Sequence, residues 1–120
     1  MLVVFRAGSP ICPGEKLFAA VVALRISGGP PATMRAEWCA RLQGQGAPIV
    51  TTSDDTADPI VWIVGAEGDE QLHGFRGDNG EELFTGNPLP GLLHFVTILA
   101  AAGRLYVAGD GRVFAFGPAH

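Results

Sequence analysis

The stretch LHGFRGDNGEELF, residues 72–84, decides the fold that we expect for this chain. A run of aliphatic and aromatic residues, LHGF, leads into a polar turn that ends at Gly80. The chain then enters a second strand-like run that reaches Phe84. Short apolar runs joined by glycine-containing polar turns are typical of antiparallel β-strands. The start of the same sequence motif occurs again in VFAFG, residues 113–117, and less clearly in VVALR, residues 21–25.

The composition limits the class of protein. The 120 residues suffice for one domain of ordinary size. An apolar content of 48% and a mean hydropathy of +0.27 exclude a disordered chain. The 17 glycines and 9 prolines predict many short elements, which favours β-structure. A net charge of −4 provides no basic surface for nucleic acid.

Neither a membrane span nor a leader is expected from the apolar segments. The longest apolar run, residues 17–24, is far shorter than the roughly 20 residues of a membrane-spanning helix. The opening residues MLVVFRAG lack the basic and apolar regions of a signal peptide.

The two cysteines, Cys12 and Cys39, are too few for a zinc site or a disulfide scaffold. The sequence leaves open whether they form one disulfide or whether Cys39 is a buried free thiol.

From Pro48 onward, apolar or alternating runs bounded by Gly, Pro or Asp predict a series of strands. The runs are PIVTTS (48–53), IVWIVGA (60–66), QLHGFRG (71–77), EELFTG (81–86), FVTILAAA (95–102), RLYVAG (104–109) and RVFAFG (112–117). The Asp-Gly pair that ends at Gly111 is a hairpin signal, because glycine accepts a positive φ. Before Pro48, KLFAAVVALRI (16–26) favours a strand through its β-branched centre, and MRAEWCARL (34–42) fits either a strand or a short helix.

An internal repeat of about 40 residues relates these strands. The segment 47–75 matches the segment 94–116 strand for strand, with Gly74 and Ala115 at equivalent positions and Ala23 at a fainter third. A repeat of this length that carries four short strands is the signature of β-propeller blades.

We therefore predict an all-β chain, residues 1–120, built from antiparallel four-stranded blades of the β-propeller type. Residues 17–42 are expected to form a partial blade and residues 48–86 a full blade. Residues 95–117 are expected to form a blade that lacks its last strand.

The same residues resemble the pyrroloquinoline-quinone-type β-propeller repeats of quinoprotein alcohol dehydrogenases and of their non-enzymatic relatives. The family phrase is roughly G-x-L-Y-A-x-D-x-x-T-G-x-x-x-W. In this frame Gly74 takes the alanine position, Gly80 the turn glycine and Phe84 the tryptophan. GRLYVAGDGRVFAF resembles the strands that precede the phrase, and AEWCA resembles an earlier copy that keeps its tryptophan, Trp38.

The chain departs from the family phrase at two positions. Arg76 stands where the family has aspartate, and Phe84 replaces the tryptophan. In the family that tryptophan docks between neighbouring blades, so the repeat is a degenerate one. The resemblance implies that the motif residues pack blades together and form turns. These residues are Trp38, Gly74, Phe75, Gly80, Phe84, Tyr106, Gly111, Ala115 and Phe116.

No catalytic, cofactor-binding or metal-binding residue can be assigned from the sequence, and no cofactor is expected. The quinoprotein site needs a calcium ion, a catalytic aspartate, a tryptophan that lies under the quinone ring and often a pair of adjacent cysteines. In this chain Cys12 and Cys39 are not adjacent, and no matching set of ligands can be placed. The acidic runs DDTAD (54–58) and GDNGEE (77–82) lack the spacing of a calcium loop, so we expect solvated turns. His73 is expected to be a satisfied or surface side chain. The histidines have no mutual ligand spacing; they are His73, His94 and His120.

The expected function is a non-enzymatic protein-binding scaffold that is part of a larger quinoprotein-like propeller. The alternative is a segment of a quinone-dependent alcohol dehydrogenase without its cofactor site, and enzyme activity stays uncertain. Because blades bury their faces on neighbours, this chain is expected to be a fragment, a self-completing oligomer or a marginal fold. Partners are expected to be proteins or other copies of the chain, bound through exposed blade faces. The family resemblance alone implies a periplasmic or exported location.

Overall fold

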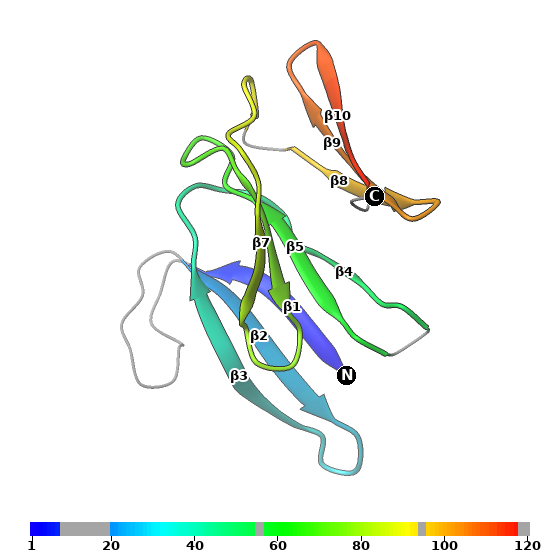
Figure 1. Ribbon diagram of the computed structural model, residues 1–120. Helices are drawn as coiled ribbons and strands as arrows, with labels where there is room; N and C mark the ends of the chain where they lie inside the picture. The colour runs from blue at the N-terminus through cyan, green and yellow to red at the C-terminus, as the bar shows by residue number, and fades with distance from the viewer. Residues whose placement is uncertain (8–19, 55–56, 94–95, 118–120) are drawn as a thin grey trace.

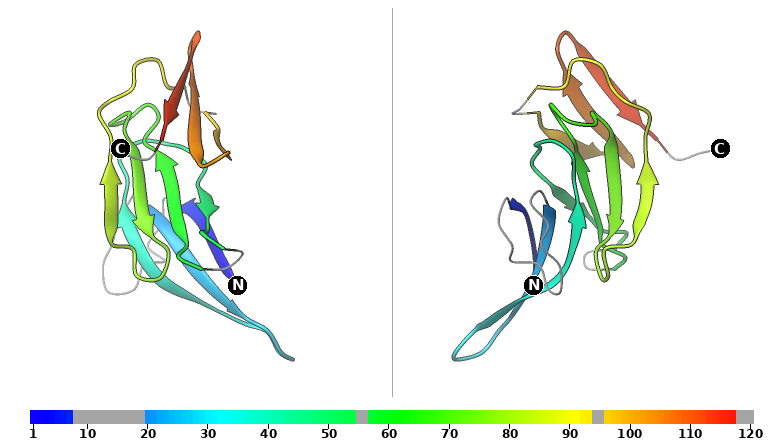
Figure 2. Two further views of the ribbon diagram at one scale, coloured as in Figure 1. Left: turned by 45° about the vertical axis from the view of Figure 1, so that its right-hand side comes forward. Right: turned by 90° about the vertical axis from the view of Figure 1, so that its left-hand side faces the viewer.

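The protein is described here by a computed structural model that covers residues 1–7, 20–54, 57–93 and 96–117. All regular elements in these residues are β-strands, and they form antiparallel sheets of three or four strands (Figure 1). The all-β, antiparallel part of the prediction is therefore confirmed. The sheets lie next to one another and do not close into a ring (Figure 2). Within the described ranges there is no apolar helix of membrane-spanning length.

The first sheet has the order β1-β2-β3 and contains β1 (Leu2–Ala7), β2 (Ala20–Ser27) and β3 (Thr33–Arg41). The helical alternative for residues 34–42 is wrong, because this segment pairs along its length with β2. The strand β1 is not among the strands that the sequence predicts. Its residues were considered only as a signal peptide, whose basic and apolar regions they lack. It pairs with the β-branched centre of β2 and extends the sheet by one strand.

The middle sheet has the order β4-β5-β6-β7, with β4 (Ile49–Thr51), β5 (Ile60–Val64), β6 (Leu72–Arg76) and β7 (Glu82–Thr85). The third sheet contains β8 (Ile98–Ala101), β9 (Arg104–Gly109) and β10 (Arg112–Phe116), with β9 in the centre. Each strand that the sequence predicts beyond Pro48 is present, with shorter ends. Alternating or branched apolar runs between glycine-rich turns are therefore sufficient to define these strands.

Strand registers in the middle and third sheets are equivalent. In the middle sheet Trp62 stands between its two cross-strand partners, Ile49 on β4 and Gly74 on β6. In the third sheet Tyr106 stands in the same way between its partners on the neighbouring strands, which are Leu99 and Ala115. Gly74 and Ala115, the positions matched in the sequence repeat, thus have the same place in two sheets.

The first sheet follows the same register. Ala23 pairs with Trp38 on the next strand, as Gly74 pairs with Phe84. In both strand pairs the register shifts directly after the equivalent residue. A register shift of this kind is typical of a β-bulge, which bends the strand and changes the direction of the side chains beyond it. The first and middle sheets therefore have the same irregularity at the same point.

Both faces of the two central strands of the middle sheet, β5 and β6, are largely buried, which places the core between sheets rather than within one. Side chains alternate along a strand, so Ile63 faces the first sheet and Val64 faces the third. One cluster joins the first and middle sheets and contains Val21, Ala23, Trp38, Leu42, Val61, Ile63 and Phe75. The other joins the middle and third sheets and contains Val64, Ala66, Leu72, Leu89, Leu92, Val96, Ile98, Leu105 and Val107.

The state of the cysteines is settled for one of the two. Cys39 on β3 is disulfide-bonded, which decides between the two alternatives that the sequence leaves open. The other cysteine of the chain, Cys12, lies outside the described residues, as do His94 and His120.

Candidate functional site

The contact of Trp38 with the middle sheet is the most specific interaction between two sheets. Trp38 is 6% exposed, and its indole Nε1 donates a hydrogen bond of 2.7 Å to the carbonyl oxygen of Gly77. The ring lies against Gly80, where an added Cβ would stand 2.6 Å from Cε3 of Trp38. Gly80 also has a φ of +79°, so both the turn and the ring require glycine. The β6–β7 turn is therefore shaped to receive this tryptophan.

An aromatic contact accompanies this hydrogen bond. The ring centroids of Trp38 and Phe75 lie 6.1 Å apart with a tilt of 43°. Phe75 is itself buried on β6, so the tryptophan contacts both the strand and the turn that follows it. We call this contact between the first and middle sheets the first junction.

The second junction, between the middle and third sheets, has the equivalent aromatic pair. Phe84 and Phe116 lie 6.2 Å apart between centroids, at 80° to each other. Phe84 also contacts Trp62 of its own sheet edge-on, at 6.0 Å. Because Phe84 is smaller than tryptophan and has no donor, this junction lacks the hydrogen bond of the first. A cavity of about 470 Å³ opens here; its lining includes Trp62, Leu72, Phe84, Leu105 and Phe116.

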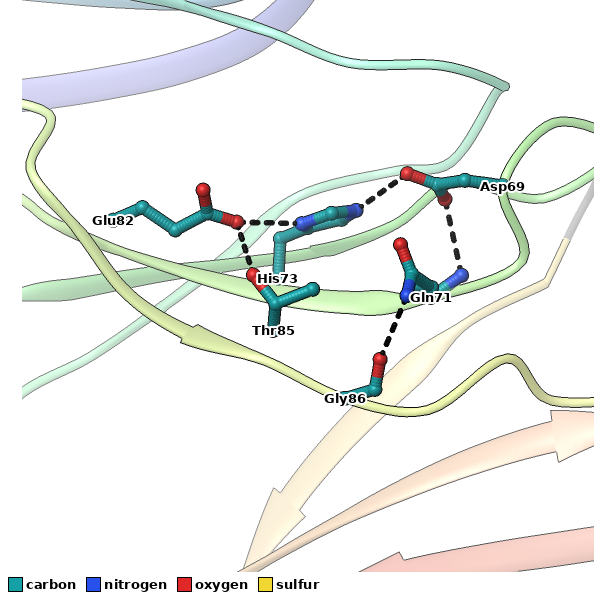
Figure 3. Close-up of polar contacts among 6 residues, drawn as sticks. All are labelled: Asp69, Gln71, His73, Glu82, Thr85 and Gly86. Carbon is teal, nitrogen blue, oxygen red and sulfur yellow. Dashed lines mark hydrogen bonds and ion pairs between the residues drawn. The ribbon is translucent and has the colours of Figure 1, made fainter.

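A polar cluster surrounds His73 on β6 (Figure 3). His73 is 8% exposed, and its ring stacks on that of Phe75 at 6.0 Å. Nδ1 lies 2.9 Å from Oε1 of Glu82, and Nε2 lies 2.8 Å from Oδ2 of Asp69. Both ring nitrogens thus face carboxylate oxygens, which accept a hydrogen bond from any ring N–H directed at them. His73 is a buried and satisfied side chain, one of the two expectations from the sequence.

Further hydrogen bonds hold the two carboxylates in place. Oδ1 of Asp69 accepts a bond of 3.0 Å from the backbone N–H of Gln71, whose side chain donates to the carbonyl of Gly86 at 3.0 Å. The hydroxyl of Thr85 donates to Oε1 of Glu82. Together, the bond from Thr85 and the bond from His73 lower the pKa of Glu82 below its ordinary value of 4.5. The cluster ties the β5–β6 turn to β7.

The geometry of this cluster does not suit a metal ion. Asp69 and Glu82 lie at opposite ends of the imidazole ring, so their oxygens do not converge on one point (Figure 3). Across the part of the chain that the structure describes, no three His, Cys, Asp or Glu side chains form a group that could hold a metal.

The GDNGEE run forms a turn, as expected, except at Glu82, which begins β7 and belongs to the His73 cluster. Oδ1 of Asn79 accepts a hydrogen bond of 2.9 Å from the backbone of Glu81, and Arg76 pairs with Glu81 at 3.1 Å. Both partners of that ion pair are largely exposed, so it contributes little stability. For the DDTAD run, residues 55 and 56 lie outside the described ranges.

The residues that the sequence singled out divide among four places. Trp38, Phe75 and Gly80 meet at the first junction, and Phe84 and Phe116 meet at the second. Gly111 lies in the β9–β10 turn with a φ of +68°. The remaining three are Gly74, Tyr106 and Ala115, which occupy the equivalent central registers of β6, β9 and β10.

Gly74 has a physical reason for the absence of a side chain. The ring of Trp62, its cross-strand partner, covers it, and an added Cβ would lie 2.6 Å from Cζ3 of that ring. In the third sheet the smaller Tyr106 pairs with Ala115, so a methyl group is present there. The glycine at this position thus follows from the size of Trp62.

The residues that the sequence did not identify are the partners rather than the motif positions. They are the acceptor carbonyl of Gly77 and the polar partners of His73. The expected pairing of the strands that become β6 and β7 could have located the cluster. This pairing sets Thr85 opposite His73 and so brings β7 beside the ring.

Comparisons of the chain with known protein families, curated proteins and solved structures give no match. A function for the chain is therefore inferred from the geometry of the two junctions and of the His73 cluster.

Replacement of Trp38 by phenylalanine tests the first junction. We expect Trp38→Phe to lower the free energy of unfolding by about 1–3 kcal/mol, because the carbonyl of Gly77 loses its donor and the smaller ring leaves a void. Urea titration followed by circular dichroism measures the change. Trp62→Phe is the matched control, since its indole bonds to Thr51 within one sheet, and a smaller loss is expected. Equal stability of Trp38→Phe and the wild type would contradict the first junction.

Replacement of Glu82 by glutamine tests the charge in the His73 cluster. The pKa of Glu82 is lowered in the folded chain, so its ionised form stabilises the fold above about pH 4.5, and this contribution disappears as the pH falls through the lowered pKa. Glu82→Gln keeps an oxygen acceptor but has no charge. We expect it to be less stable than the wild type near about pH 7, and the difference to shrink toward about pH 3. Thermal unfolding across this range measures it; a constant difference would refute the role of the charge.

Proposed function

We propose that this chain is a non-enzymatic β-propeller repeat module, part of a larger quinoprotein-like propeller, that acts as a protein-binding scaffold. The observation that carries the proposal is the docking of Trp38 of one sheet into the β6–β7 turn of the next. A tryptophan that docks between neighbouring blades is what the resemblance to quinoprotein repeats leads us to expect. Gly80, the receiving glycine, is the turn glycine of that phrase.

The repeated registers support the same proposal. The three sheets have equivalent residues at Ala23, Gly74 and Ala115, and the two aromatic junction pairs are equivalent as well. Repeat proteins are stabilised by interfaces between successive units, because a single unit cannot bury its apolar faces alone. The side chains of the repeat motif therefore serve the contact between sheets.

The polar groups support a role without catalysis. A general base or nucleophile must present a free atom to its substrate. His73, the buried histidine of the described residues, has both ring nitrogens engaged with Glu82 and Asp69. The cluster holds the β5–β6 turn against β7 and leaves neither nitrogen for a reacting group.

Exposed apolar side chains on the third sheet support a role in binding. Leu99 is 61% exposed and Val113 is 69% exposed, on β8 and β10. Contiguous apolar residues on a protein surface commonly mark a site of protein contact.

Equilibrium dialysis with pyrroloquinoline quinone distinguishes the scaffold from a segment of a quinone-dependent dehydrogenase. The purified chain is dialysed against the quinone with calcium and, separately, with a calcium chelator. We expect equal quinone concentrations on both sides of the membrane in either case. An apoenzyme of the quinoprotein dehydrogenase class is the positive control. Saturable, calcium-dependent retention of quinone would overturn the proposed function.

A further inference from the structure

The cavity of about 470 Å³ at the second junction is lined by side chains of both the middle and the third sheet. Two of them, Leu72 and Leu105, are buried. Three others are aromatic rings, those of Trp62, Phe84 and Phe116. The ring of Phe84 is 39% exposed, although it contacts both other rings edge-on. We call this space the second-junction cavity.

The second-junction cavity suits an uncharged molecule. The described residues that line it have no charged side chain. The indole N–H of Trp62 already donates a hydrogen bond of 2.9 Å to the hydroxyl of Thr51, so this wall is apolar as well. A charged ligand would lose its hydration here without gaining a counter-charge. A cation is further opposed by Arg104, whose Cγ and Nε would lie 3.8 Å from a Cβ added at Gly117, a lining residue.

Strand register shows why there is unfilled space at this junction. Phe84 has the position in the middle sheet that Trp38 has in the first sheet, and Phe116 has the position of Phe75. The two aromatic pairs have nearly equal centroid distances, 6.1 Å at the first junction and 6.2 Å at the second. The second junction therefore keeps the ring contact of the first but has a single ring in place of an indole.

The missing part of the indole and the cavity lie on the same side of the aromatic pair. At the first junction the indole of Trp38 extends past Phe75 and reaches the carbonyl of Gly77. At the second junction the lining of the cavity extends past Phe116 to Gly117. The space beside Phe84 thus corresponds to space that an aromatic ring system occupies between the first two sheets.

We propose that the second-junction cavity binds an uncharged planar aromatic molecule of one or two fused rings. Its rings would pack against those of Trp62, Phe84 and Phe116 and would cover the exposed surface of Phe84. The cavity has the size of a small-molecule site, for which about 300–1,000 Å³ is typical. An apolar protein cavity of about 150 Å³ lined by Leu, Ile and Phe is already large enough to bind benzene. The inference goes beyond the proposed function, because it requires only the cavity between two sheets.

Isothermal titration calorimetry of the purified chain with indole tests the site. We expect saturable binding of one indole per chain with a dissociation constant of about 1 mM or lower. Nuclear magnetic resonance locates the site, and we expect shift changes at Leu72, Leu105 and Phe116. The absence of saturable binding, or shift changes confined to other residues, would overturn the inference.

Phe84→Trp fills the cavity from within. We expect it to bind indole at least about tenfold more weakly than the wild type and to raise the midpoint of thermal unfolding. Val113→Trp is the matched control, since Val113 is 69% exposed on β10 and does not line the cavity. It is expected to bind indole as the wild type does. If Phe84→Trp does not fold, Phe116→Leu replaces it and is expected to weaken binding at least about threefold through loss of a ring. Unchanged binding in the variant used would contradict the site.

Two further probes test the class of ligand. Tryptamine adds an ammonium group to the indole ring and is expected to bind more weakly than indole. N-acetyltryptophanamide presents the same ring as a protein side chain does, and its amide groups would have no partners in the apolar lining, so weaker binding is expected again. Binding of tryptamine as tight as that of indole would refute an uncharged ligand. Equally tight binding of N-acetyltryptophanamide would assign the cavity to a tryptophan of a partner protein and overturn the inference.

Discussion

One buried side chain, Trp38, makes the hydrogen bond and the ring contact that join the first sheet to the middle sheet. Its hydrogen bond to the carbonyl of Gly77 and its ring contact with Gly80 join β3 to a turn of the next sheet. A buried carbonyl without a donor costs about 1–3 kcal/mol, so sliding of one sheet over the other is opposed by more than the loss of apolar contact. The hydrophobic clusters supply most of the burial, but they are not directional. The tryptophan supplies a directional side-chain contact between the two sheets, and backbone hydrogen bonds from Gln45 to Ala66 and from Asp69 to Gln43 join the segment after β3 to the middle sheet.

The second junction shows what happens when this interaction is weakened. Phe84 keeps the aromatic contact through Phe116 but has no donor, and a cavity lies beside it. The second junction therefore lacks the indole hydrogen bond of the first, although its hydrophobic cluster is the larger of the two.

The strands beyond Pro48 could be predicted because each run is bounded by turn residues and alternates in a way that fits a pleated strand. The strand β1 could not, because its apolar run is equally typical of other segments and its partner β2 lies beyond residues 8–19. Gly80 was recognised as a turn glycine, but its contact with Trp38 depends on how two sheets pack. The His73 cluster was missed for a similar reason: Asp69 comes from a turn and Glu82 from β7, and strand register alone brings them to one ring.

Nuclear magnetic resonance of the indole groups tests the central claim most directly. The indole N–H of Trp38 is buried and bonded between sheets, whereas that of Trp62 bonds to the Thr51 hydroxyl in a half-buried position. The account predicts cross-relaxation between the ring protons of Trp38 and the α-protons of Gly80. It also predicts slower hydrogen exchange at the indole of Trp38 than at that of Trp62. Equal, fast exchange at both indoles, with no cross-peak to Gly80, would contradict it.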